Sequence, residues 1–577
     1  MERKISKALQ TVDFSGASDL PLNILTLLNE TANELIYPFN EFIGTISQKH
    51  SDNLDWWVSA PAVRDVHCSN LFFHCCCAIA MKKALRDGFS PDRIVVDSAA
   101  LKIIMEKLCC EFGSAAQCVS VSPFGKAGVF LISLGNFLAY QLRGFFFAKM
   151  FRRTLKKASK NAVTLVDSFV LDDIFAERYY PGLWEALGND EKASVYFVPQ
   201  PYGIKKYLSF YRRLFSSGKN YLLKEHFLKI EDYVFAFSYF FRSSKLKIDD
   251  YFIDGINVSE LAREELNLRK GFNSSTHGLL NYRFVKRLKE SKIKIKLFVN
   301  WFENQALDKG LNRGLKEYYP ETVTKGYQGF INSDAYLNYF PQGYEQLANV
   351  LPDEVCVIGE KLKSRVASHC PDIRVSVAPA FRFSGVFNSN RQEKVKSKFT
   401  VLVALPIFNS ERRQILNMLG SYLKEFGSCE ILFNIKCHPA TNPEKVKKEF
   451  PEVWPEEFTI VGGSFESQIS DSDLLITGCS SACMETMARG IPVVIIGNFR
   501  GLTFNPVPGD LKTDIYRLVL SCEEFRKAIE AFRNRTEEAK KNHRNTGQWI
   551  KENYLAPVTR ESARNFLDLE KNFDFKT

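Results

Sequence analysis

Short β-rich runs alternate with helical stretches from Phe399 onwards, and this alternation limits the fold more than any other feature of the sequence. Alternation of this kind is typical of parallel sheets that are covered by helices. The predicted strands are Phe399–Leu405, Glu430–Lys436, Phe458–Val461, Leu474–Thr477 and Pro492–Ile496. Predicted helices at Ser410–Phe426 and Ser481–Arg489 lie among them. We therefore predict a doubly wound, Rossmann-like α/β domain in this part of the chain.

The N-terminal half shows the same alternation, which predicts a second α/β domain. Its predicted strands are Arg93–Asp97, Gln117–Val121, Ala162–Asp167, Ala193–Val198 and Lys294–Asn300. A chain of 577 residues is too long for one hydrophobic core, so we expect several domains. The predicted division is a helical cap over 1–60, a Rossmann-like domain over 61–385, a second one over 386–550 and a helical tail over 551–577. The Asn-, Gln- and Lys-rich segment 387–398 is the best linker candidate.

Charge and cysteine usage exclude some classes of protein. The net charge of +11 is spread along the chain, and no aromatic-interleaved basic motif of a nucleic-acid module is present, so we expect no nucleic-acid partner. The 14 cysteines include a run, Cys75–Cys77, in an apolar stretch, and no paired CxxC spacing supports a zinc site. The N-terminus leads into no apolar signal segment. A reduced, cytoplasmic protein is the simplest interpretation.

One apolar segment admits two interpretations. Residues Ala127–Tyr140 are almost all apolar, and the run continues through Phe145–Phe147 into a basic stretch at 152–157. The uninterrupted apolar part ends at Arg143, short of the roughly 20 residues that a spanning helix needs. The segment is then either a buried core helix with a solvated basic end, or a helix that lies on an anionic membrane surface.

The sequence Lys436-Cys437-His438-Pro439 follows the predicted strand over 430–436. A strand that ends in this way places a fixed cation and a titratable donor in one turn, and Pro439 ends the strand. Both groups suit a phosphate, the lysine as a point charge and the histidine as a hydrogen-bond donor. The alternative is a solvated lysine beside a histidine whose hydrogen bonds are satisfied within the turn.

A second motif follows the strand Leu474–Thr477. Gly478 forms a turn, and Ser480 and Ser481 open the next helix. Backbone N–H groups and two hydroxyls at such a point form a site for phosphate. Glu485 returns to the same helix face one turn later, where a carboxylate accepts from ribose hydroxyls. The alternative is ordinary capping by Ser480 with a solvated Glu485.

These motifs carry a family resemblance. The segment 472–498 resembles the donor-binding segment of GT-B glycosyltransferases, in which a Gly/Ser turn, a helical Glu and a G-x-P-V strand follow one another. The pairing of Lys-x-His-Pro at 436–439 with Ser480 and Ser481 is similar to bacterial sialyltransferases and to capsule-type Kdo transferases, which use CMP-activated sugars. CDP-glycerol polymerases show a similar pairing. The resemblance implies two Rossmann-like domains facing a cleft, with C-terminal helices packing back across both. It also implies that His438 contacts the CMP phosphate or cytidine with Lys436 in support, and that Ser480 and Ser481 hold the phosphate.

Two carboxylates in the N-terminal half are candidate catalytic groups. Asp254, followed by Gly255, resembles the Asp-Gly motif that carries the base in bacterial sialyltransferases, although Ile253 stands where that motif has an acid. Glu303 follows the strand Lys294–Asn300 and resembles a Glu-x-Gln element of bacterial surface-carbohydrate proteins. Either residue is a candidate for deprotonating an acceptor hydroxyl, or for acting as nucleophile. The alternative for each is a turn or capping residue.

The combined interpretation is a metal-independent glycosyltransferase without a cofactor. Its donor substrate would be a CMP-activated nonulosonic or ulosonic acid, and its acceptor a surface glycan or lipid-linked glycan of capsule, O-antigen or lipopolysaccharide. The alternatives are a CDP-alditol phosphotransferase, a UDP-sugar GT-B transferase or epimerase, and a non-enzymatic scaffold docked on a membrane. The membrane interpretation of 127–160 adds a peripheral position on the inner face of the cytoplasmic membrane.

Overall fold

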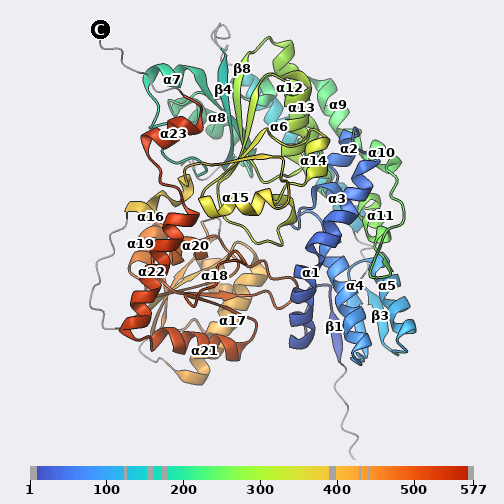
Figure 1. Cartoon of the computed structure of the whole chain (residues 1–577), viewed down its shortest axis with the longest axis vertical. Helices are drawn as coiled ribbons and strands as arrows, with labels where there is room; N and C mark the ends of the chain where they lie inside the picture. Colours follow the sequence, from blue (N-terminus) through green and yellow to red (C-terminus); the bar gives the residue numbers. More distant parts are fainter. Residues whose placement is uncertain are drawn as a thin grey trace, which may run out of the picture.

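The structure is a computed structural model that describes residues 10–121, 126–151, 162–171, 178–388, 398–427, 431–439 and 441–569. These residues form three parallel sheets and one short antiparallel hairpin, and helices cover the sheets. Figure 1 shows the domain of the last sheet below, the domain of the middle sheet above, and the N-terminal unit beside both. The segment 387–398 lies for the most part outside the described residues and joins the two larger domains in sequence.

The C-terminal sheet has six parallel strands in the order β14-β13-β12-β15-β16-β17. Its strands are β12 (Phe399–Ala404), β13 (Ile431–Lys436), β14 (Phe458–Ile460), β15 (Leu474–Thr477), β16 (Val493–Ile496) and β17 (Tyr516–Val519). Its helices are α17 (Asn409–Phe426), α18 (Pro443–Glu449), α19 (Phe465–Ser470), α20 (Ala482–Met487) and α21 (Cys522–Arg533). This is the strand order of a Rossmann fold, and the order reverses between β12 and β15, where such folds bind ligands.

The middle sheet is also parallel and six-stranded, in the order β11-β10-β9-β8-β4-β5. Its strands are β4 (Val163–Leu171), β5 (Val195–Tyr202), β8 (Ile295–Trp301), β9 (Val323–Gln328), β10 (Glu354–Val357) and β11 (Arg374–Val377). Its longer helices are α6 (Lys126–Met150), α8 (Tyr207–Ser216), α9 (Ile230–Phe237), α12 (Phe272–Glu290), α13 (Ala306–Tyr318) and α15 (Glu360–Ala367), and its short ones are α7 (Asn189–Ser194), α10 (Tyr239–Arg242), α14 (Gly343–Leu347) and α16 (Ser384–Asn388). The strand order reverses between β4 and β8, so this sheet too is doubly wound.

The N-terminal unit differs from the predicted arrangement. The strands expected at 93–97 and 117–121 join a strand that the sequence did not reveal, and β1 (Thr11–Asp13), β2 (Arg93–Val96) and β3 (Gln117–Ser120) form a sheet of their own. Helices α1 (Leu22–Gln48), α4 (Leu71–Arg86), α5 (Ala99–Glu111) and α11 (Ser259–Asn267) surround it, with the short α2 (Leu54–Trp57) and α3 (Ala60–Val63). The run Cys75–Cys77 is fully buried in this core, where the thiols pack as small apolar groups. Alternation predicts parallel strands but not which strands share a sheet, so β2 and β3 were wrongly placed in the sheet of the 61–385 domain.

The C-terminal helices pack back across both larger domains, as predicted. Helix α22 (Glu537–Tyr554) lies so close to the turn before β16 that a Cβ on Gly547 would come within 2.4 Å of the Gly490 backbone nitrogen. Helix α23 (Arg560–Phe566) reaches the middle domain, where Arg564 lies 2.7 Å from Glu191. Figure 1 shows these helices running from the lower domain to the upper one. The predicted fold, two Rossmann-like domains in the GT-B arrangement, is confirmed.

No helix in the described part of the chain is both long enough and apolar enough to cross a membrane.

Candidate functional site

A cavity of about 600 Å³ opens at the carboxyl ends of the C-terminal strands and reaches the N-terminal half. The loops after β12, β13, β14, β15 and β16 form one side of it. The other side consists of residues from four separate places in the first two-thirds of the chain: His67, Arg178, Tyr336 and Arg382. The cavity therefore lies at the point of strand reversal, where the topology of the sheet predicts a ligand.

The end of β13 supplies the predicted Lys436, His438 and Pro439 to this cavity. The Lys436 ammonium donates to the carbonyl oxygen of Gly463 at 2.6 Å, which fixes its position beside the loop after β14. Burial lowers the pKa of His438, and the neighbouring Arg178 and Arg412 lower it further. The imidazole is thus held neutral at pH 7, and a bound anion would favour its protonated form.

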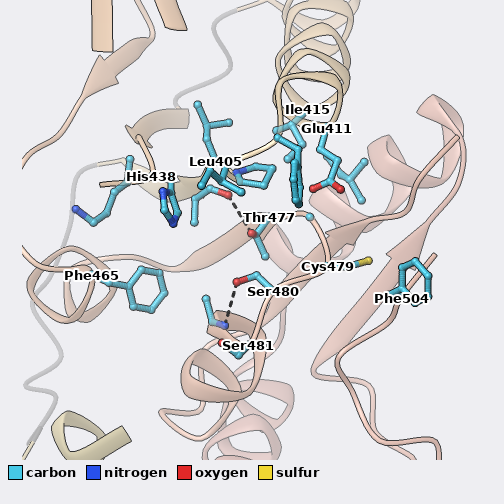
Figure 2. Close-up of a pocket in the computed structure, with 18 of the residues that line it drawn as sticks. Leu405, Glu411, Ile415, His438, Phe465, Thr477, Cys479, Ser480, Ser481 and Phe504 are labelled. Atoms are coloured by element: carbon cyan, nitrogen blue, oxygen red, sulfur yellow. Dashed lines mark hydrogen bonds between the residues drawn. The ribbon is translucent and has the colours of Figure 1, made fainter. Parts of the chain in front are cut away.

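The turn after β15 lies opposite, and Figure 2 shows His438, Ser480 and Ser481 around the same space. Gly478, Ser480, Ser481 and Glu485 all line the cavity. The Ser480 hydroxyl accepts from the backbone N–H of Ala482 at 3.3 Å and so stabilises the turn, but the N-cap of α20 is Ser481, whose side chain makes no capping hydrogen bond. The structure therefore brings both predicted motifs to one cavity.

Glu485 is not solvated, in contrast to the alternative interpretation. Its side chain is 20% exposed and lies 3.3 Å from the Arg489 guanidinium. Burial raises the pKa of Glu485, while Arg489 opposes that shift. A carboxylate that is fixed by an arginine at the cavity wall is suited to accept hydrogen bonds from sugar hydroxyls.

Arg382 is a cavity residue that the sequence did not reveal. It follows β11 in a short 3₁₀ helix (Phe381–Phe383), and its guanidinium carbon lies 5.5–6.0 Å from the ring centres of Tyr179, Trp301 and Phe330. Within the described residues, Arg382 forms no ion pair; burial lowers its pKa, and the Glu303 carboxylate opposes part of that shift. A cation among aromatic rings that forms no ion pair among the described residues suits an anion at this end of the cavity.

The N-terminal unit contributes His67, which the sequence did not indicate either. The His67 ring lies 5.2 Å from the ring of Tyr336 and 6.5 Å from that of Phe408 in the C-terminal domain. Three residues earlier, Arg64 adopts a positive φ of 60°. Its fully buried guanidinium lies 2.9 Å from Glu345, which also binds the buried Lys309. This buried ion network fixes the loop that presents His67 to the cavity.

Replacing Glu345 with Gln tests that network. The change leaves the guanidinium of Arg64 and the ammonium of Lys309 buried without their shared carboxylate. We expect the free energy of unfolding to fall by about 3–5 kcal/mol, as measured by urea denaturation. Glu360→Gln, at a side chain that is 69% exposed, is the matched control and should change little. Equal stability of the two variants would contradict the role of the network.

Glu303, one of the two predicted candidate bases, does not line the cavity. Both of its carboxylate oxygens are occupied, one by the indole N–H of Trp301 at 2.7 Å and the other by the amide of Gln305 at 3.0 Å. Burial raises its pKa, and it is not among the residues that line the cavity. Glu303 thus holds Trp301, and Trp301 is one of the rings that surround Arg382 at the cavity.

Asp254, the other of the two predicted candidate bases, lies outside the cavity. Asp254 and Gly255 are the two turn residues between β6 (Phe252–Ile253) and β7 (Ile256–Asn257), with φ values of 48° and 73°. Positive φ at both positions is the reason that Asp-Gly is favoured in tight hairpins. The Asp254 carboxylate is 54% exposed, lies 3.2 Å from Lys82 and does not line the cavity. The Asp254-Gly255 motif is therefore explained by the hairpin turn.

Glu411, in the first turn of α17, is the acidic group that the sequence did not single out. It lines the cavity, and Figure 2 shows its carboxylate extending from α17 toward the strand end at Cys479. Burial raises the pKa of Glu411. In the part of the chain that the structure describes, its carboxylate has no hydrogen-bond or ion-pair partner. It is therefore poised to accept a proton or a hydrogen bond from a ligand.

The described residues contain no group of three or more His, Cys, Asp or Glu side chains placed to hold a metal ion.

Comparisons with known proteins return distant structural similarity only. The chain is similar to the S. aureus protein MnaA in complex with UDP, with 12% identity and a TM-score of 0.42 over 72% of this chain and 100% of that chain. It is similar to an α,α-trehalose 6-phosphate synthase from Burkholderia multivorans, with 10% identity and a TM-score of 0.40 over 71% and 96%. It is also similar to the glycotransferase of kitacinnamycin, with 10% identity and a TM-score of 0.40 over 71% of this chain and 100% of that chain. No protein-family model matches the chain, and a search of curated proteins found no match. The fold assignment therefore rests on the strand order of the chain's own two sheets.

Proposed function

We propose that the chain is a GT-B glycosyltransferase that transfers a sugar from a nucleotide-activated donor to a glycan acceptor. The observation that carries this proposal is the composition of one cavity at the strand-reversal point of a Rossmann-like domain. Cationic, imidazole and hydroxyl groups from both halves of the molecule line it: Lys436, His438, Ser480, Ser481, Arg178 and Arg382. These groups suit the charged phosphate of a nucleotide that acts as the leaving group.

The reaction transfers the anomeric carbon of the sugar from a phosphate oxygen to an acceptor oxygen. As the bond from the anomeric carbon to the phosphate oxygen breaks, its electron pair leaves with the nucleotide, and negative charge grows on the phosphate. Lys436, His438 and Arg382 are placed to stabilise that charge, and preorganised groups of this kind contribute several kcal/mol to the transition state. The carboxylate of Glu485 is placed to hold the hydroxyls of the donor.

Glu411 takes the role that was predicted for Asp254 or Glu303. In an inverting route, its carboxylate accepts the proton of the acceptor hydroxyl while the acceptor oxygen attacks the anomeric carbon. Burial supports this role, because the raised pKa of Glu411 brings it closer to neutral pH, where a general base is most effective.

The donor that we propose is a CMP-activated ulosonic or nonulosonic acid, on the strength of the Lys-x-His-Pro and Ser-Ser motifs. A thermal-shift panel of CMP, CDP, UDP and GDP tests this choice. A ligand at 100 times its Kd stabilises the folded state by about 2.7 kcal/mol, so we expect CMP to raise Tm most. A larger shift with CDP would favour a CDP-alditol phosphotransferase, and one with UDP a UDP-sugar enzyme. No shift with any of the four would contradict a nucleotide-dependent transferase and favour a scaffold.

A further inference from the structure

Helix α6 has one face packed on the protein and one face exposed. On the packed face, Phe145 contacts Tyr233, Phe147 stacks on Tyr207 and Ala148 is fully buried. On the opposite face, three large apolar side chains recur every four residues and are exposed to solvent: Leu142 at 61%, Phe146 at 62% and Met150 at 61%. A spacing of four residues places them in one stripe along the helix. We call these three residues the apolar stripe.

Helix α8 lies directly beside α6, because Phe147 and Phe151 of the α6 segment stack on Tyr207 and Tyr211 at 5.5 and 5.8 Å between ring centres. The surface around this contact carries further exposed apolar groups, Leu208 on α8 and Tyr202 at the end of β5. Basic side chains are exposed on the same two helices and on the turn before α8: Arg143, Lys205, Lys206, Arg212 and Arg213. Helices α6 and α8, with the turn before α8, thus expose both large apolar and basic side chains.

We propose that this face of α6 and α8 docks on the surface of an anionic phospholipid bilayer. Soluble monomers rarely expose a continuous row of large apolar side chains, and such a row marks an interaction site. Arginine and lysine beside an apolar stripe are the composition of helices that lie in the membrane interface, with the apolar groups below the headgroups and the cations among the phosphates. The charge of the flanking residues selects this occupant over a second copy of the chain, which would bring the same positive charges together.

The sequence allowed two interpretations of residues 127–157, and the basic stretch 152–157 lies outside the described residues. The helix is a core helix on its Phe147 side and an exposed apolar surface on its Phe146 side. Docking does not depend on the proposed chemistry, since none of the surface residues lines the cavity. A transferase that works on lipid-linked acceptors would gain from such docking, because it confines the enzyme to the surface where those acceptors lie.

Vesicle co-sedimentation of the full chain tests the proposal. We expect binding to vesicles of phosphatidylcholine and phosphatidylglycerol at 7:3, weaker binding at 0.5 M salt, and little binding to phosphatidylcholine alone. The triple variant L142S/F146S/M150S should lower the partition coefficient at least tenfold, and R143Q/R212Q by roughly 25-fold, about fivefold per charge. All five side chains are exposed, and circular dichroism of the variants verifies that they fold.

Two matched controls distinguish vesicle binding through this surface from nonspecific binding. Leu347→Ser removes a leucine that is 87% exposed elsewhere, and Lys541→Gln removes an exposed charge on α22, so both should bind vesicles like the wild type. Equal binding of the stripe variant and the wild type would overturn the proposal. So would light scattering that shows a wild-type dimer and a monomeric stripe variant, because the stripe would then be an interface between copies.

Discussion

Replacing Glu411 with Gln is expected to lower kcat for sugar transfer by about 10²–10⁴-fold, the range for loss of a general base. The substitution keeps the shape of the side chain and removes its ability to take a proton. Nucleotide affinity should stay within about twofold, since Glu411 is assigned to the acceptor and not to the phosphate. The measurement is kcat by steady-state assay together with Kd for the nucleotide by calorimetry.

Two other glutamates make this experiment decisive. Glu425→Gln, on an exposed part of the same helix α17, is the matched control and should leave kcat unchanged. Glu303→Gln should reduce activity indirectly, because Glu303 holds Trp301 beside Arg382, and it should also change the nucleotide Kd. If Glu303→Gln alone abolishes kcat at unchanged Kd while Glu411→Gln retains activity, the base is Glu303, as the sequence suggested.

Replacing Arg382 with Met is expected to weaken nucleotide binding by about 10–100-fold, because a hydrogen bond to a charged group contributes about 1.5–3 kcal/mol. The same change should not lower the stability of the free protein. Arg382 forms no ion pair among the described residues, so its removal relieves the desolvation cost of its charge, and Met fills a similar volume among the rings of Tyr179, Trp301 and Phe330.

This opposite effect on binding and on stability distinguishes a ligand-binding arginine from a structural one. Calorimetric Kd and urea denaturation of the same preparation report both quantities. Arg374→Gln, at an exposed position on β11, should alter neither. A large loss of stability in Arg382→Met with unchanged Kd would show that the arginine serves the aromatic cluster and not a ligand.

The donor side of the site could be predicted from sequence because its residues lie in short contiguous motifs at strand ends. In a parallel sheet every carboxyl end faces the same edge, so Lys436 and His438 after β13 had to lie near Ser480 and Ser481 after β15. The buried strands β15 and β16 are apolar except for Thr477 at the end of β15, and such runs made the sheet predictable.

The other side of the cavity could not be predicted, because it is assembled from segments that are far apart in the sequence. His67 and Tyr336 stand in loops and Arg382 in a short 3₁₀ helix, all with ordinary local patterns, and only the tertiary packing brings them together. Glu411 has the position of a common first-turn acidic residue, and its lack of a partner is visible only in three dimensions. Asp254 shows the converse, since a strong local signal for a turn resembled a catalytic motif.

The most direct test of the account is a calorimetric titration of CMP into the wild type and into Lys436→Ala and His438→Gln, at pH 6.5 and pH 8. The free protein holds the pKa of His438 below its ordinary value of 6.5, and a bound phosphate raises it. Binding should therefore take up protons and tighten as the pH falls from 8 to 6.5. His438→Gln should lose that proton uptake, and Lys436→Ala should bind at least tenfold more weakly. CMP binding that is the same in all three proteins and independent of pH would place the nucleotide elsewhere and contradict the proposed site.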